Sequence, residues 1–225
     1  MSFLVIEGLD GSGKSTQLGL LKKYMEDNDI RFKYLHFPRL EEGIYGKLVA
    51  RFLRGEMGDI DQVDPYLVAL IFAGDRWEAK EMVEGWLAEG NLVLIDRYVY
   101  SNIAFQCAKY TDPAEQRKLQ NWILDLEFAK YLLPKPDLNI FLDVPFEFTK
   151  ERLSEGRKGD DRDYLNGQND IHEQDLGFQG KVRNIYHSLC HDVDNISIVD
   201  CADEDGRMLT PEAIFDKLLG IISFS

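Results

Sequence analysis

The chain has 225 residues, a formal net charge of -14, and 44% hydrophobic and 29% charged residues. This length and ordinary composition predict a soluble globular protein with a single α/β domain over residues 1–225. The acidity argues against nucleic acid as a partner, because negative charge repels phosphate backbones. No apolar run approaches the ~20 residues of a membrane span, and three widely spaced cysteines favour reduced thiols in the cytoplasm.

Short apolar runs alternate with longer segments of helical periodicity, which predicts a parallel sheet covered by helices. Helices should begin at Pro65, Pro113 and Pro211, because proline suits the first helical position and each follows a capping Asp or Thr. Residues 65–89 are expected as one long helix or a pair of helices. The expected strands are residues 3–6, 32–37, 92–96, 138–144 and 196–200.

The first expected strand leads into EGLDGSGKST, which fits the phosphate-binding pattern G-x-x-x-x-G-K-[ST] and precedes a helical segment. Backbone N–H groups of such a turn face phosphates, Lys14 adds a point charge, and Ser15 offers a ligand for Mg²⁺. The sequence contains no N-K-x-D element for guanine, which favours a transferase over a GTPase. The expected phosphate-binding residues are Gly8, Leu9, Asp10, Gly11, Ser12, Gly13, Lys14, Ser15 and Thr16.

Asp96 ends the third expected strand, at the carboxyl edge where ligands bind in open α/β sheets. Its carboxylate can hold Mg²⁺ or a water of the ion, and Arg97 beside it can grip a second phosphate. A plain ion pair at the strand end is the alternative. Anion-binding groups on two different strands hint at an acceptor that is itself phosphorylated.

Two pairs of residues could read a base. Phe72 and Arg76 are four apart on an expected helix, so a ring and a guanidinium share one face. Asn102 and Phe105 could supply an amide for a base and an aromatic wall for a sugar. A core phenylalanine beside an ordinary surface arginine is the alternative for the first pair, and a similar structural role is the alternative for the second.

Together these residues resemble the thymidylate kinase family of P-loop nucleoside monophosphate kinases. The segments EGLDGSGKSTQ, HFPR, FAGDR, IDRYVYSNIAF, LPKPDLNIFLDV and DLGFQGKVRNIYHSL occur in family order over nearly the whole chain. The resemblance implies a P-loop kinase fold, with a five-stranded parallel sheet flanked by helices and a mobile lid at about residues 154–180. It also implies transfer of the γ-phosphoryl group of ATP to dTMP with Mg²⁺, by a cytoplasmic homodimer.

Two other functions remain open. One is a kinase for another monophosphate or for a nucleoside, and the other is a non-catalytic nucleotide-binding module. The intact Lys14, Asp96 and Arg97 and the basic lid argue against the second.

The resemblance also implies roles for single residues. Phe72 would stack on thymine, Arg76 would bond its carbonyl edge, and Asn102 would touch the base. Arg97 would hold the phosphate of dTMP, and Phe105 would pack where a 2′-hydroxyl group would project. The full dTMP site would comprise Asp10, Phe37, Pro38, Arg39, Phe72, Arg76, Arg97, Asn102, Phe105 and Tyr164.

Gly11 stands where some family members carry an arginine, so positive charge must reach the transferred phosphoryl group from elsewhere. The segment EGRKGDDRDY offers Arg157, Lys158 and Arg162, with Arg152 before it on the ATP side; a solvated charged loop is the alternative. The implied catalytic residues are Asp10, Lys14, Arg97, Arg157 and Arg162. The implied metal ligands are Asp10, Ser15 and Asp96, with Asp10 also near the 3′-hydroxyl group of the acceptor.

Overall fold

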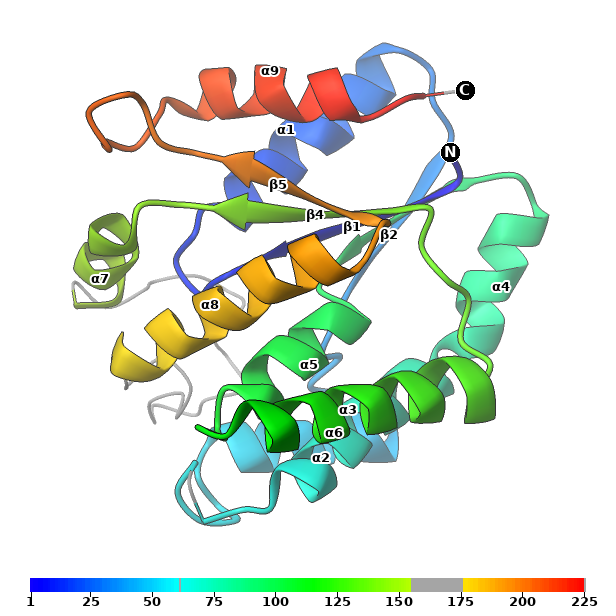
Figure 1. The fold of residues 1–225 in the computed structure, drawn as a ribbon. Helices are drawn as coiled ribbons and strands as arrows, with labels where there is room; N and C mark the ends of the chain where they lie inside the picture. The colour runs from blue at the N-terminus through cyan, green and yellow to red at the C-terminus, as the bar shows by residue number, and fades with distance from the viewer. Residues whose placement is uncertain (61, 155–175, 225) are drawn as a thin grey trace.

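The computed structural model describes residues 1–60, 62–154 and 176–224. Its centre is a five-stranded parallel sheet with strand order β2-β3-β1-β4-β5 and helices on both faces (Figure 1). The predicted strands and the predicted fold class are therefore confirmed. The strands are β1 (Phe3–Gly8), β2 (Phe32–His36), β3 (Leu92–Asp96), β4 (Leu138–Asp143) and β5 (Ile196–Asp200).

The helices lie in two layers. In the described ranges no helix combines the length and apolarity needed to cross a bilayer. The helices there are α1 (Lys14–Asp27), α2 (Gly43–Leu53), α3 (Pro65–Glu78), α4 (Lys80–Ala88), α5 (Val99–Cys107), α6 (Pro113–Leu124), the π-helix η1 (Asp125–Lys130), α7 (Phe146–Ser154), α8 (Leu176–Asp192) and α9 (Pro211–Ile221).

The three helix starts predicted from proline are confirmed at α3, α6 and α9. Asp64 accepts a hydrogen bond from the N–H of Tyr66 at 2.8 Å, and Asp112 accepts one from the N–H of Ala114 at 2.9 Å. Each cap satisfies a backbone donor that the first turn of a helix leaves unpaired. Residues 65–89 form the pair α3 and α4, one of the two predicted alternatives.

β1 is the central strand, and all six of its residues are buried. Leu4 and Ile6 pack in one cluster with residues of α1 and α9, while Phe3 and Val5 pack in the other cluster with residues of α5 and α8. This division agrees with the arrangement in Figure 1, where α1 and α9 cover one face of the sheet and the remaining large helices cover the other. Burial on both faces explains why β1 is a continuous apolar run rather than an alternating one.

α2 is a helix that the sequence did not predict. It packs against α3 through the ring of Tyr45, which lies so close to Gly74 that an added Cβ there would sit 2.3 Å from a ring carbon. Only glycine permits this approach. The contact brings α3, with its FAGDR segment, against the chain that follows β2.

Asp137 fastens the start of β1 to the start of β4. Its Oδ2 accepts hydrogen bonds from the backbone N–H groups of Ser2 at 2.6 Å and Phe3 at 3.0 Å. Partial burial alone would raise the pKa of Asp137, but these two donors outweigh it, so the pKa lies below its ordinary value. A carboxyl group whose pKa falls on folding contributes stability above its unfolded-state pKa, and loses it as the pH falls through the folded-state pKa.

We expect Asp137→Asn to lower the free energy of unfolding at neutral pH, by at most about 1 kcal/mol because the side chain is exposed. The loss should shrink as the pH falls below the ordinary carboxyl pKa of about 4 and through the lower folded-state pKa, where the wild-type carboxyl group itself becomes protonated. Urea unfolding at neutral pH and at such an acidic pH measures this, with Asp216→Asn at an exposed position of α9 as the control. An equal loss at both pH values would contradict the account.

Candidate active site

The turn between β1 and α1, residues 9–13, lies at the carboxyl edge of the sheet. Gly11 has φ 74° and Gly13 has φ 81°, both in the left-handed region that glycine adopts without strain. A Cβ at Gly8 would lie 2.7 Å from the hydroxyl oxygen of Ser12. The glycines of the motif are therefore required by the close turn that carries the chain into α1.

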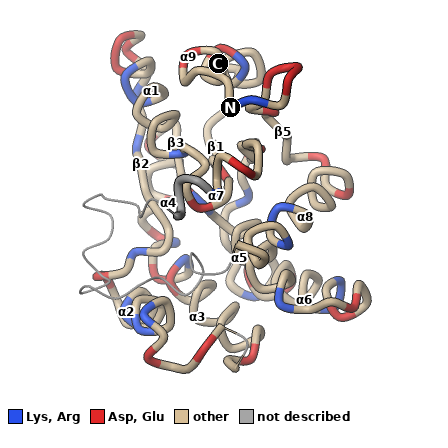
Figure 2. Tube along the Cα trace, turned by 90° about the vertical axis from the view of Figure 1, so that its left-hand side faces the viewer, with Lys and Arg blue, Asp and Glu red and all other residues tan. Residues whose placement is uncertain are grey.

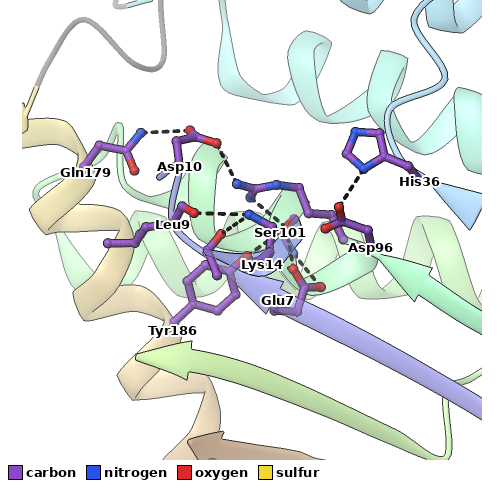
Figure 3. Close-up of polar contacts among 11 residues, drawn as sticks. Glu7, Leu9, Asp10, Lys14, His36, Asp96, Ser101, Gln179 and Tyr186 are labelled. Carbon is purple, nitrogen blue, oxygen red and sulfur yellow. Dashed lines mark hydrogen bonds and ion pairs between the residues drawn. The ribbon is translucent and has the colours of Figure 1, made fainter. Parts of the chain in front are cut away.

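Lys14 is the first residue of α1, and only 9% of it is exposed. Its Nζ donates to the carbonyl oxygen of Leu9 at 3.1 Å, so the ammonium group lies against the loop (Figure 3). Ser15 and Thr16, which follow in the first turn, are exposed. A helix N-terminus preceded by such a loop is a site for anions, because backbone N–H groups and the helix dipole both favour negative charge.

Asp96 ends β3, which is hydrogen-bonded to β1. Its Oδ2 lies 3.0 Å from Nδ1 of His36, at the end of β2 (Figure 3). Its Oδ1 is buried and has no hydrogen-bond partner among the described residues. Burial alone would raise the pKa of Asp96, but the hydrogen bond from His36 and the nearby Lys14 hold that pKa below its ordinary value. Asp96 is therefore a carboxylate with one buried oxygen that accepts no hydrogen bond from the described residues.

Arg97 follows Asp96 with φ 66°, an unusual conformation for a residue with a side chain. Its Nη2 donates to Oδ1 of Asp10 at 2.7 Å, and its guanidinium carbon lies 5.0 Å from the ring centre of Phe105. The second oxygen of Asp10 accepts a hydrogen bond from Nε2 of Gln179, in α8, at 3.0 Å. Burial alone would lower the pKa of Arg97, but the Asp10 carboxylate outweighs it and raises that pKa. Asp10 thus joins the phosphate loop to two other elements.

Glu7 is a site residue that the sequence analysis did not identify. It is fully buried in β1 and accepts hydrogen bonds from the N–H groups of Tyr98 at 3.0 Å and Ser101 at 3.3 Å, and from the hydroxyl group of Tyr186 at 2.9 Å. Burial raises the pKa of this carboxyl group. Since α5 has no side-chain cap of its own, Glu7 caps it from a neighbouring strand and fixes the chain next to Arg97. The sequence did contain a signal for Glu7, namely a charged residue at the end of an otherwise apolar strand.

Arg76 and Asn102 meet at a second buried carboxylate, that of Glu127 in η1. Arg76 is 3% exposed and donates through Nε at 2.5 Å and Nη2 at 2.7 Å to the two oxygens of Glu127. Nδ2 of Asn102 donates to Oε1 of Glu127 at 2.9 Å and to the carbonyl oxygen of Ala69 at 3.0 Å. Arg76 is therefore not the ordinary surface arginine that the sequence left open. Phe72, one turn earlier on α3, is half-buried.

Phe37, Pro38 and Arg39 follow β2, with a cis peptide bond between Phe37 and Pro38. Asp75, in α3, accepts hydrogen bonds from Arg39 through the backbone N–H at 2.8 Å and through Nε at 3.0 Å. Arg39 also donates through Nη1 to Glu42 at 2.9 Å. This arginine therefore joins its segment to α3, and its contact with dTMP stays a prediction.

The remaining predicted residues belong to the lid. Arg157, Arg162 and Tyr164 lie outside the described residues, and so does the side chain of Arg152, whose backbone belongs to α7. The last five residues of the predicted lid range, 176–180, form the beginning of α8, where Gln179 contacts Asp10. In Figure 1, α7 and the start of α8 lie beside the carboxyl ends of the strands.

Several outer parts of the molecule are acidic. Figure 2 shows acidic segments at the end of α1 and in the loop between β5 and α9. Lys14 and Arg97 instead lie largely buried at the carboxyl edge of the two neighbouring strands β1 and β3. Within a chain of net charge -14, this edge therefore carries two cations, Lys14 and Arg97, that lie near the same carboxylate, Asp96, and their positive charge suits an anionic ligand.

The fold and this edge define an α/β nucleotide-binding protein of the P-loop class, with a glycine-rich loop leading from a central parallel strand into a helix and a carboxylate on the adjacent strand. A family model described as thymidylate kinase matches residues 6–207. The chain belongs to the thymidylate kinase family.

Individual relatives agree with this assignment. The chain is 33% identical over 224 residues to the probable thymidylate kinase of Pyrococcus horikoshii, covering 97% of this chain and 98% of the relative. It is 30% identical over 221 residues to the thymidylate kinase of Homo sapiens, covering 95% and 91%. A solved thymidylate kinase from Candida albicans superposes with a TM-score of 0.70 at 28% identity, covering 97% of this chain and 89% of the other. The family therefore accounts for the fold of nearly the whole chain.

Proposed function

We propose that this protein is an ATP-dependent thymidylate kinase, which transfers the γ-phosphoryl group of ATP to dTMP and yields dTDP and ADP. The observation that carries the proposal is the contact between Asp10 and Arg97 at 2.7 Å. It joins the loop suited to the donor phosphates to an arginine suited to the acceptor phosphate. Family membership supports the same reaction.

The chemistry requires alignment of two anions and neutralisation of the charge that develops on the transferred group. Lys14 and the N-terminus of α1 would bind the phosphates of ATP. Arg97 would hold the phosphate of dTMP, and Asp10 would fix the direction of the guanidinium group. Because a phosphate oxygen of the acceptor is already negatively charged, the acceptor needs no general base.

The residues at this edge fit a magnesium ion. Oδ1 of Asp96 is buried and unpaired among the described residues, and Ser15 is exposed at the start of α1. Mg²⁺ characteristically takes one or two protein oxygens and fills its octahedron with water and substrate phosphates. Accordingly, no cluster of three or more metal-binding side chains is required, and none occurs in the described part of the chain. Asp96 and Ser15 would hold the ion, which when bound supplies positive charge to the phosphates.

Asp10 is a weaker choice for a metal ligand. Both of its oxygens accept hydrogen bonds, one from Arg97 and one from Gln179. We therefore assign it chiefly to the positioning of Arg97 and to the acceptor side of the site.

The base side of the proposed site comprises Phe72, Arg76 and Asn102. Phe72 would stack on thymine, while Arg76 and Asn102 would face its polar edge. Phe105 lies under the guanidinium group of Arg97 and would form the wall beside the sugar. The segment Phe37 to Arg39, held against α3 by Asp75, would line the same site.

Steady-state kinetics with dTMP, dUMP, dCMP and thymidine test the proposed function. We expect dTMP to give the highest kcat/KM and dUMP to fall about 10- to 200-fold below it, since one methyl group in a pocket contributes about 1–3 kcal/mol. ADP release should require the acceptor. A preference for thymidine or another monophosphate would contradict the choice of substrate, and the absence of acceptor-dependent ADP release would indicate a non-catalytic module.

We propose that residues 154–180 act as a lid whose arginines supply the charge that Gly11 cannot. Arg157→Ala or Arg162→Ala should lower kcat by roughly 10² or more while the dTMP affinity changes little, by analogy with arginine fingers. Arg117→Ala, on an exposed position of α6, is the matched control and should keep the wild-type kcat. Wild-type kcat in both lid variants would refute this role; Arg152 would then be the next candidate.

We propose a homodimer, which the family resemblance implies and the surface of α3 supports. Leu67 is 59% exposed and Trp77 is 50% exposed, and helical spacing places both, with Leu70, on one side of α3. Sedimentation equilibrium should give twice the chain mass of 25.9 kDa, and Leu67→Lys should shift the equilibrium towards the monomer. Ile221→Lys on α9 is the control. A monomeric wild-type protein would overturn the proposal.

We also propose a cytoplasmic location and one functional domain over residues 1–225. All three cysteines, Cys107, Cys190 and Cys201, are free. Free thiols are the usual state in a reducing compartment.

A further inference from the structure

Glu127 is a fully buried carboxylate that none of the predicted roles uses. It lies in η1, a single turn of π-helix that continues α6, and π-helical turns frequently occur at functional sites. Its two oxygens accept three hydrogen bonds, two from Arg76 and one from Asn102. Glu127 therefore contacts both polar residues of the proposed base site.

The contacts of Asn102 determine which way its amide group points. Its Nδ2 lies between the carboxylate of Glu127 and the carbonyl oxygen of Ala69, and both of these groups can only accept. The opposite orientation would place an amide oxygen against two acceptors. Oδ1 is consequently directed to the other side, where it is buried and has no partner among the described residues. A buried amide oxygen of this kind calls for a donor, which a ligand or an ordered water can supply.

The guanidinium group of Arg76 has a complementary role. Glu127 engages Nε and Nη2, which fixes the plane of the guanidinium group, and a guanidinium group can only donate. The proposed site therefore presents a donor from Arg76 and an acceptor from Asn102. Thymine offers the matching pair, the acceptor O4 beside the donor N3–H. Cytosine offers the reverse, a donor amino group beside the acceptor N3.

We propose that Glu127 is the positioning residue that makes the site select dTMP over dCMP, by holding the amide of Asn102 with its oxygen towards the base. This inference rests on the proposed function. Glu127 does not touch the substrate in this scheme. It acts through Asn102: without the carboxylate, only the carbonyl oxygen of Ala69 would oppose a reversed amide that presents its NH₂ group to N3 of cytosine.

Glu127→Gln tests the inference, because the new side chain has one acceptor where the wild type has two. When the remaining oxygen takes the place of Oε2, which accepts from Nε of Arg76, the NH₂ group takes the place of Oε1, faces Asn102 and favours the reversed amide. We expect the ratio of kcat/KM for dTMP to that for dCMP to fall at least about tenfold. The fall should arise mainly from KM rather than kcat.

Two further variants separate positioning from general damage. Asn102→Ala keeps the pair of Arg76 and Glu127 and should also lower the ratio. The double variant should lower it no further than Asn102→Ala alone, because Glu127 acts through Asn102. Asn139→Ala removes another buried side-chain hydrogen bond, to the carbonyl oxygen of Asn195 near the opposite edge of the sheet, and should change Tm without changing the ratio.

The outcomes distinguish this inference from the proposed function. If the wild type phosphorylates dTMP but both Glu127→Gln and Glu127→Ala, which leaves no acceptor for Asn102, fold and keep the wild-type ratio, the inference is wrong and the function stands. If the two single effects on the ratio simply add, Glu127 does not act through Asn102 and the inference is again wrong. If the wild type does not phosphorylate dTMP, the proposed function fails, and the inference fails with it.

Discussion

The ion pair between Asp10 and Arg97 is the contact on which the site depends. The two residues are 87 positions apart, and their side chains meet at 2.7 Å because β1 and β3 are neighbours in the sheet. Glu7 fixes the backbone next to Arg97, because it caps α5, which begins two residues after Arg97. Gln179 of α8 supports it from the other side, through the second oxygen of Asp10. Four elements therefore set the position of one guanidinium group, which suits a reaction that requires two phosphates in line.

Two adjacent residues of α3, Asp75 and Arg76, each form a buried ion pair. Arg39 pairs with Asp75, and Arg76 pairs with Glu127, so charges of alternating sign run from the end of β2 to the base side of the site. Burial is costly for each ion, and a buried pair seldom stabilises a fold more than apolar residues of the same size would. Their value is geometric. Each ion pair restricts the orientations of its two side chains. The N–H groups that are not used in the pair, and can bind a ligand, therefore point in a fixed direction.

Much of the fold could be predicted from the sequence because the signals are local. The strands are short apolar runs, and the starts of α3, α6 and α9 each carry a capping side chain before a proline. The phosphate loop is also local, since residues 8–15 contain the glycines, the lysine and the hydroxyl group. The fold class, the strands and these helix starts are confirmed, while phosphate binding by the loop stays a prediction. The roles of the lid arginines stay predictions, because those residues lie outside the described part of the chain.

The sequence by itself determined the class of chemistry, because the phosphate loop is formed by one continuous motif. The order of this motif and the later segments along the chain indicates the family. Only the tertiary structure decided how the site is held. Glu7 and Glu127 each accept hydrogen bonds from side chains at least 25 positions away, and no local sequence pattern predicts such partners. The physical reason is that burying an unpaired carboxylate is costly, so its donors come from whichever segments the fold places next to it. EGLDGSGKST indicates a bound phosphate, while the direction of Arg97 and of the Asn102 amide depends on which strands and helices become neighbours.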